Sequence, residues 1–258
     1  MTTMNSNRRL SQSWCRAAIF LAAIASVCGP RAAEAQTTWT VTTGTWSAGT
    51  SWQGGTAPTA TGTAYFSDAS VGSSGVTSLL STNVTIAGLS FNTSGSTVIS
   101  AASSTAALLT LGTGGIAMNA TSGAVTIGAS GSAVNLSLAG TQTWTNDSSG
   151  LLSILGTIDG SSALTIAGSG STTLSGQIRG LSSLTKDGGG MLTLSAANMF
   201  SGTTRVVNGG LTVNNAGALQ WSTLDRATGD TGTVTFNQAS TLGGLAGTSN
   251  LSLGSLML

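Results

Sequence analysis

Short apolar pairs at i, i+2 spacing recur from residue 84 onward, and glycine-rich breaks separate them. The pairs are Val84/Ile86, Leu89/Phe91, Ile116/Met118, Val125/Ile127, Val134/Leu136/Leu138, Leu152/Ile154, Leu164/Ile166, Leu192/Leu194, Leu211/Val213, Val234/Phe236 and Leu251/Leu253. The breaks lie at 112–115, 168–170, 188–190 and 209–210. This spacing puts both members of a pair on one face of a strand, and the Ser, Thr, Gly and Asn between them suit an exposed face. Strands this short, repeating about every 8–12 residues, predict an all-β fold.

The strands are too short and too poor in aromatic residues for a sandwich. A stacked solenoid needs only short strands and tight corners, and 37 of the 258 residues are Gly. We therefore predict a right-handed parallel β-helix, or β-solenoid, over 84–258. At roughly 20–25 residues a rung, the chain would form about ten rungs. No segment after residue 35 shows a capped helical period, so we expect almost no helix there.

The N-terminus has the three parts of a secretory signal. Basic residues occupy positions 8, 9 and 16, an apolar run follows over 17–27, and Ala33-Glu34-Ala35 is an A-x-A cleavage site. We predict a cleaved signal helix at 1–35, and hence a secreted or cell-surface protein. The apolar run is too short to span a bilayer, so we expect no integral membrane segment after cleavage.

Charge and composition exclude several classes of site. The chain has no His, only 6% charged residues, and both of its Cys within 1–35. Four basic residues and six Asp remain after residue 35, too few and too scattered to form a nucleic-acid-binding surface. We find no phosphate-binding loop, no nucleophile elbow and no metal-ligand spacing. We predict a non-enzyme with no catalytic, cofactor-binding or metal site.

One segment carries a family resemblance. Residues 184–198 read LTKDGGGMLTLSAAN, and residues 199–211 continue MFSGTTRVVNGGL. This stretch resembles the autotransporter-associated β-strand repeat, also called the passenger-associated transport repeat, whose usual form begins L-T-K-x-G-x-G-x-L-T-L-S-G-A-N. Ala196, Phe200 and Thr203 depart from the pattern. The resemblance implies a repeat that aids export of a passenger, usually beside a C-terminal translocator barrel.

The repeat also has an interpretation from its residues alone. We expect six side chains to point inward and stack: Leu184, Leu192, Leu194, Val206, Leu211 and Val213. Glycines 188–190 would form a tight corner, and Asn198 and Asn208 would occupy others. Lys186 and Asp187 are expected on the solvated face. At the front, 36–83 would hold the first strands and a cap, in which Trp39, Trp46 and Trp52 cover the open first rung.

We therefore expect an exported, non-catalytic passenger with a structural or adhesin-like role, whose repeat assists secretion or folding. Its partners would be an outer-membrane translocator and a cell-surface or polysaccharide target. No run of barrel strands follows the repeat, so we expect a fragment or a passenger without its own translocator.

Two alternatives stay open. A ligand- or ice-binding solenoid could use Thr141, Thr143 and Thr145, or Thr231, Thr233 and Thr235, as ranks of one array. A polysaccharide-degrading β-helix enzyme would need paired carboxylates, and Asp225 and Asp230 are the nearest pair.

Overall fold

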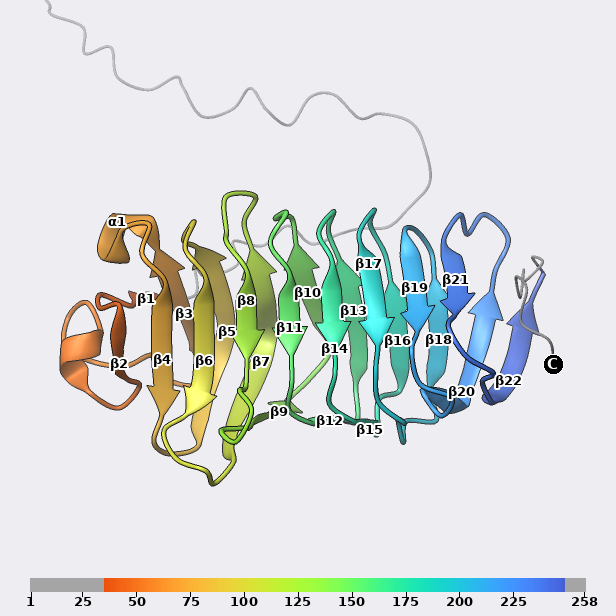
Figure 1. Ribbon diagram of the computed structural model, residues 1–258, viewed down its shortest axis with the longest axis horizontal. Helices are drawn as coiled ribbons and strands as arrows, with labels where there is room; N and C mark the ends of the chain where they lie inside the picture. The colour runs from red at the N-terminus through yellow and green to blue at the C-terminus, as the bar shows by residue number, and fades with distance from the viewer. Residues whose placement is uncertain (1–34, 249–258) are drawn as a thin grey trace, which may run out of the picture. The chain divides into compact units, whose positions relative to one another are not determined.

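The strand pairs of the chain are parallel throughout in the computed structural model, which describes residues 35–248 (Figure 1). They form one sheet of thirteen strands and one of nine. The alternating pairs therefore lie in a parallel solenoid, as predicted. Two short helical segments complete these residues: the 3₁₀ turn η1 (Gly49–Ser51) and the helix α1 (Asp68–Val71), whose N-cap is Ser67.

The solenoid has three faces. Face 1 is the main path of the thirteen-stranded sheet, in the order β1 (Ala35–Thr38), β3 (Gly62–Ser67), β5 (Val84–Asn92), β7 (Ala107–Met118), β10 (Gln142–Asn146), β13 (Ala163–Ala167), β16 (Ser183–Lys186), β18 (Thr203–Val206), β20 (Leu219–Arg226) and β22 (Leu242–Gly247). Face 2 is the nine-stranded sheet: β2 (Thr43–Thr45), β4 (Val76–Leu80), β6 (Thr97–Ala101), β8 (Val125–Ile127), β11 (Leu152–Ile154), β14 (Thr172–Leu174), β17 (Met191–Leu194), β19 (Gly210–Val213) and β21 (Thr233–Phe236). Face 3 holds β9 (Val134–Leu138), β12 (Ile158–Gly160) and β15 (Ile178–Arg179).

Ten stacked strands in face 1 and nine in face 2 agree with the expected ten or so rungs. Figure 1 shows face 2 nearest the viewer and face 1 behind it, with β9, β12 and β15 along the bottom. Rung length varies, because the corners differ in length. Leu164 pairs with Leu184 and Leu184 with Thr204, 20 residues a rung, whereas Val98 pairs with Thr126, 28 residues later.

The core consists of rows of side chains that run along the stack. One row of face 2 is Ile99, Ile127, Ile154, Leu174, Leu194 and Val213, each stacked on the next by register and each at most 1% exposed. Full burial of such a side chain contributes about 1.5–3 kcal/mol. No rung could bury its apolar residues alone, so the core exists only because neighbouring rungs cover one another.

An aromatic cluster closes the N-terminal end of the core. Trp39, Trp46 and Trp52 are at most 3% exposed, and the ring centroids of Trp39 and Trp52 lie 4.9 Å apart, edge to face. Phe66 continues the cluster and stacks on Phe91 in the next rung at 5.1 Å. The Trp-rich segment therefore packs over the first rungs as a cap, as expected.

The expected break at 112–115 is wrong in one respect, because β7 continues through it. Val84 and Ile86 of β5 pair with Leu109 and Leu111 on the face 3 side of β7, and the register then shifts before Gly88 pairs with Gly115. Gly115 has a φ of +62°, and a Cβ there would lie 2.3 Å from the Thr143 carbonyl oxygen. These glycines therefore turn a corner within a continuous strand.

Two sequence predictions fall on residues that the structure does not describe. The expected signal helix at 1–35 lies outside the described residues except for Ala35, and so does the pair Leu251/Leu253.

Candidate functional site

The segment that resembles a transport repeat occupies the most regular rungs. β16 pairs with β18 and β17 with β19, and the 20-residue step from Leu164 to Leu184 and on to Thr204 is constant. All six residues expected to point inward are buried, at most 1% exposed: Leu184, Leu192, Leu194, Val206, Leu211 and Val213.

Lys186 is the exception to the expected arrangement. It was expected on the solvated face, but it is 1% exposed and stacks in an interior row between Ile166 and Val206. The reason is strand alternation, since Leu184 points inward and Lys186 follows two residues later. Its Nζ donates to the carbonyl oxygens of Asp187, at 3.2 Å, and Gly188, at 2.7 Å. Burial lowers the pKa of this amine, against a smaller opposing effect of Asp187.

The glycine corner beside Lys186 forms as predicted. Gly188 has a φ of +94°, which L side chains rarely adopt. A Cβ at Gly190 would lie 1.9 Å from the carbonyl oxygen of Gly170, whereas a Cβ at Gly189 would meet nothing. Gly190 is therefore required for the rungs to approach, while Gly189 is not.

Asn198 links three successive rungs. Its Oδ1 accepts the backbone N–H of Ile178 at 2.9 Å, and its Nδ2 donates to the carbonyl oxygen of Ala218 at 2.9 Å. The side chain is 2% exposed, so it satisfies backbone groups that water does not reach. The expected corner asparagine is thus a buried bracket between rungs.

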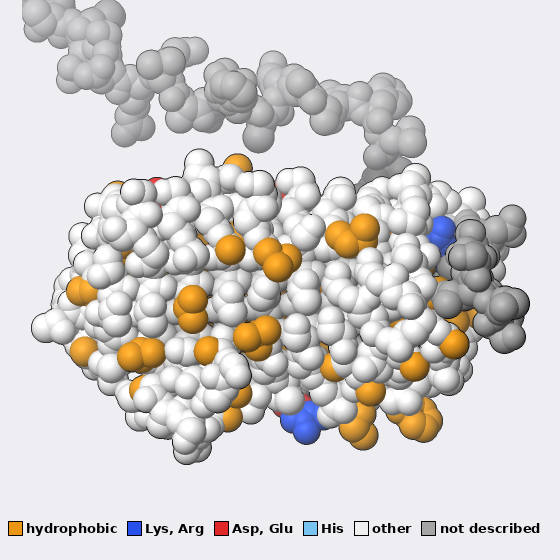
Figure 2. Space-filling model, viewed as in Figure 1, with side chains coloured by type: hydrophobic (Ala, Val, Ile, Leu, Met, Phe, Trp, Pro, Cys, Tyr) orange, Lys and Arg blue, Asp and Glu red, His pale blue; other side chains and the backbone are white. Residues whose placement is uncertain are grey.

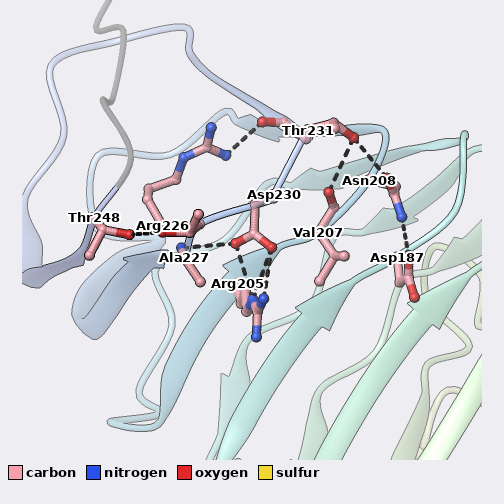
Figure 3. Close-up of polar contacts among 11 residues, drawn as sticks. Asp187, Arg205, Val207, Asn208, Arg226, Ala227, Asp230, Thr231 and Thr248 are labelled. Carbon is pink, nitrogen blue, oxygen red and sulfur yellow. Dashed lines mark hydrogen bonds and ion pairs between the residues drawn. The ribbon is translucent and has the colours of Figure 1, made fainter. Parts of the chain in front are cut away.

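A polar ladder runs along the outer corner between faces 1 and 2 (Figure 3). Asn208 donates from Nδ2 to Asp187 Oδ1 at 2.7 Å and accepts from the Thr231 hydroxyl at 2.8 Å. Asp187 therefore lies at the solvated corner, as expected, and serves as the first step of this ladder.

Asp230, one of the two carboxylates of the enzyme alternative, is engaged in structural contacts. Its side chain is 1% exposed and accepts from Arg205 Nη2 at 2.8 Å and from the backbone N–H of Ala227 at 3.0 Å (Figure 3). Hydrogen bonding to Arg205 lowers the pKa of Asp230. Asp225 pairs in register with Arg205 and helps to raise its pKa. Both carboxylates therefore have the same cation as a neighbour.

The two predicted threonine ranks belong to different sheets. Thr143 and Thr145 lie on β10 of face 1, where Thr143 pairs with Thr165 and Thr145 with Ala167. Thr233 and Thr235 lie on β21 of face 2, and Thr231 lies in the preceding corner. The two triplets therefore do not form one array.

Face 2 instead carries a threonine row that sequence inspection missed. Its outward central positions align in register from strand to strand, and we call this row the threonine ladder: Thr43, Thr77, Val98, Thr126, Ser153, Thr173, Thr193, Thr212 and Thr235. The signal in the sequence is the Thr or Ser between the two members of each apolar pair. Unequal corner lengths hide its alignment, which only the strand register reveals.

Within residues 35–248, no group of three or more acidic, His or Cys side chains could hold a metal ion. No helix in that same part of the chain is long and apolar enough to cross a membrane.

Comparison with known proteins gives one match. The model of the passenger-associated-transport-repeat family matches residues 184–220, which confirms the repeat inferred from 184–211. No curated protein and no solved structure matches the chain.

Proposed function

We propose, because residues 184–220 form an autotransporter passenger repeat, that this chain is an exported, non-catalytic β-solenoid passenger. Its role would be structural or adhesin-like at the cell surface, and its repeat would assist secretion or folding. An outer-membrane translocator would be its export partner. The observation that carries the proposal is the family match at 184–220.

The geometry of the repeat supports a role in folding. Its rungs have the constant 20-residue step, and each buries its apolar pairs only when the next rung covers them. A stack of this kind can nucleate at one place and propagate rung by rung. Regular rungs with a buried bracket at Asn198 are well suited to begin it, because they need no long corner to be ordered first.

In-register deletion tests this role. Removing 184–203 deletes one rung within the repeat, and removing 164–183 deletes one rung before it; each joins positions that pair in register. Both variants would be expressed upstream of a characterised autotransporter translocator. We expect the deletion of 184–203 to lower the protease-accessible fraction at the cell surface severalfold, and the deletion of 164–183 to leave it near the wild-type value.

Circular dichroism and urea unfolding of the purified variants would show that both still form β structure. Equal export of the two variants, with both folded, would contradict an assisting role for the repeat.

The non-catalytic part of the proposal is supported by the contacts of Asp225 and Asp230, which both have Arg205 as a neighbour. We expect no turnover of pectin- or glucan-type polymers by the purified chain. Turnover that Asp225→Asn or Asp230→Asn abolishes would establish the enzyme alternative instead.

A further inference from the structure

The threonine ladder spans the whole of face 2. Seven of its nine positions are Thr, one is Ser and one is Val. Because neighbouring strands lie about 4.8 Å apart, nine strands hold a straight row about 38 Å long. Every backbone in the row is fixed by pairing on the inner strands, so the side chains are held in place before any ligand arrives.

The hydroxyl groups of the ladder are available to a ligand. Among the residues that the structure describes, none of the ladder's Thr side chains makes a hydrogen bond within the chain, in contrast to Thr204, whose hydroxyl contacts Ser222 at 2.8 Å. Each ladder hydroxyl can donate one hydrogen bond and accept others. Each Thr also presents a methyl group beside its hydroxyl.

Face 2 is uncharged. None of its nine strands contains Asp, Glu, Lys or Arg. The outer side of face 1 carries Arg205 and Asp225, and face 3 carries the ion pair between Arg179 and Asp159. Figure 2, which looks onto face 2, shows white and orange atoms over the strands, with charged side chains only at the margins.

Exposed apolar side chains border the ladder. Leu151 and Leu155 stand on either side of β11, and Met191 opens β17; each is 40% exposed. Apolar side chains of this size, left exposed next to a row of free hydroxyls, form a surface with both hydrogen-bonding and apolar contact groups.

We propose that face 2 binds the ordered surface of a neutral polysaccharide, with the threonine ladder as its contact row. The inference rests on the proposed export to the cell surface, where such polymers are met. It deepens that proposal by naming the target class and the face of the solenoid that would bind it.

The chemistry of the face selects this class. An uncharged surface offers no ion pair to repay the desolvation of a charged polymer, which disfavours nucleic acids and polyuronates. Neutral polysaccharides present hydroxyl groups and C–H faces together, which match the Thr hydroxyls, the Thr methyls and the bordering Leu and Met. A chain laid along the ladder would meet several weak contacts at once, and their effects multiply.

A matched pair of variants tests the inference. Thr173→Lys with Thr193→Lys places two cations in the ladder on β14 and β17. Thr165→Lys with Thr185→Lys places the same two cations on β13 and β16 of face 1, in the same rungs. A third variant, Thr173→Val with Thr193→Val, removes only the hydroxyls. The purified chain would be sedimented with microcrystalline cellulose, insoluble chitin and insoluble β-1,3-glucan.

We expect the wild type to sediment with at least one of these polymers. The face 2 lysine variant should bind roughly tenfold more weakly, because two buried cations would lack partners in the complex. The face 1 variant should bind like the wild type, and the valine variant should lie between. Urea unfolding confirms that all variants are folded.

Three results would overturn the inference. One is no binding of the wild type to any of the three polymers. Another is equal loss of binding in the face 1 and face 2 variants. The third is thermal hysteresis, or dimerisation in gel filtration, that depends on Thr173 and Thr193 while polymer binding is absent, since the face would then contact ice or a second copy. Export of the chain is measured separately, so these results leave the proposed passenger role standing.

Discussion

Two buried polar side chains, Lys186 and Asn198, occupy interior positions where the preceding rung has an apolar residue. Lys186 stacks on Ile166, and Asn198 lies beside Ile178. Each reaches backbone groups at a corner that a Leu or Ile would leave without partners. At the scale of single residues, the repeat therefore uses buried polar groups to fix its corners.

Lys186 should make stability depend on pH. Its pKa is lowered by burial in the folded chain, whereas the unfolded chain titrates near the ordinary 10.5. Between those two values the unfolded chain binds more protons, so the free energy of unfolding rises with pH across that interval. Lys186→Met cannot titrate, and we expect it to flatten the rise between pH 7 and pH 10 in urea unfolding.

Arg179→Met, which removes an exposed cation, is the control and should keep the wild-type slope. An unchanged slope in Lys186→Met would refute this prediction.

Asn198 should be worth more than an ordinary surface residue. Asn198→Ala leaves the Ile178 N–H and the Ala218 carbonyl buried without their partners, which costs about 2–4 kcal/mol in the free energy of unfolding. Asn119→Ala, at an exposed position, should change it by less than about 0.5 kcal/mol. Chemical denaturation measures both, and similar values for the two variants would show that the bracket contributes nothing.

At the scale of elements, the corners decide how closely rungs approach. Gly190→Ala would place a Cβ 1.9 Å from the Gly170 carbonyl oxygen, so the rungs must move apart. We expect a loss of about 3 kcal/mol or more in the free energy of unfolding. Gly189→Ala, one residue away in open space, should change stability by less than about 1 kcal/mol, and in the stabilising direction. Thermal unfolding of the pair measures the difference, and equal effects would contradict the close-approach explanation.

At the scale of the whole molecule, the stack depends on its aromatic N-terminal cap. Trp52 is 3% exposed and donates from Nε1 to the Trp46 carbonyl oxygen at 2.7 Å. Trp52→Ala should cost about 3–5 kcal/mol and open the first rung to association through its strand edge. Trp221→Ala, at a side chain that is 61% exposed, should cost little. Unfolding with light scattering measures both effects, and a monomeric, fully stable Trp52→Ala variant would disprove the capping role.

The strand pattern of the described residues could be predicted from the sequence, because the i, i+2 pairs and glycine corners are local features. All the pairs from Leu89/Phe91 to Leu211/Val213 are buried, and the repeat at 184–211 was recognisable from its own residues. The burial of Lys186 was predictable in principle, since it follows Leu184 by two residues, but its charge argued for an exposed position.

The threonine ladder shows what only the tertiary structure decided. Each Thr lies between two inward residues of its own strand, so the sequence alone determined that it faces outward. Which Thr lies beside which depends on rung lengths that run from 19 residues, between Thr193 and Thr212, to 34, between Thr43 and Thr77. Register between strands is set by core stacking across rungs, a long-range interaction that no local pattern contains.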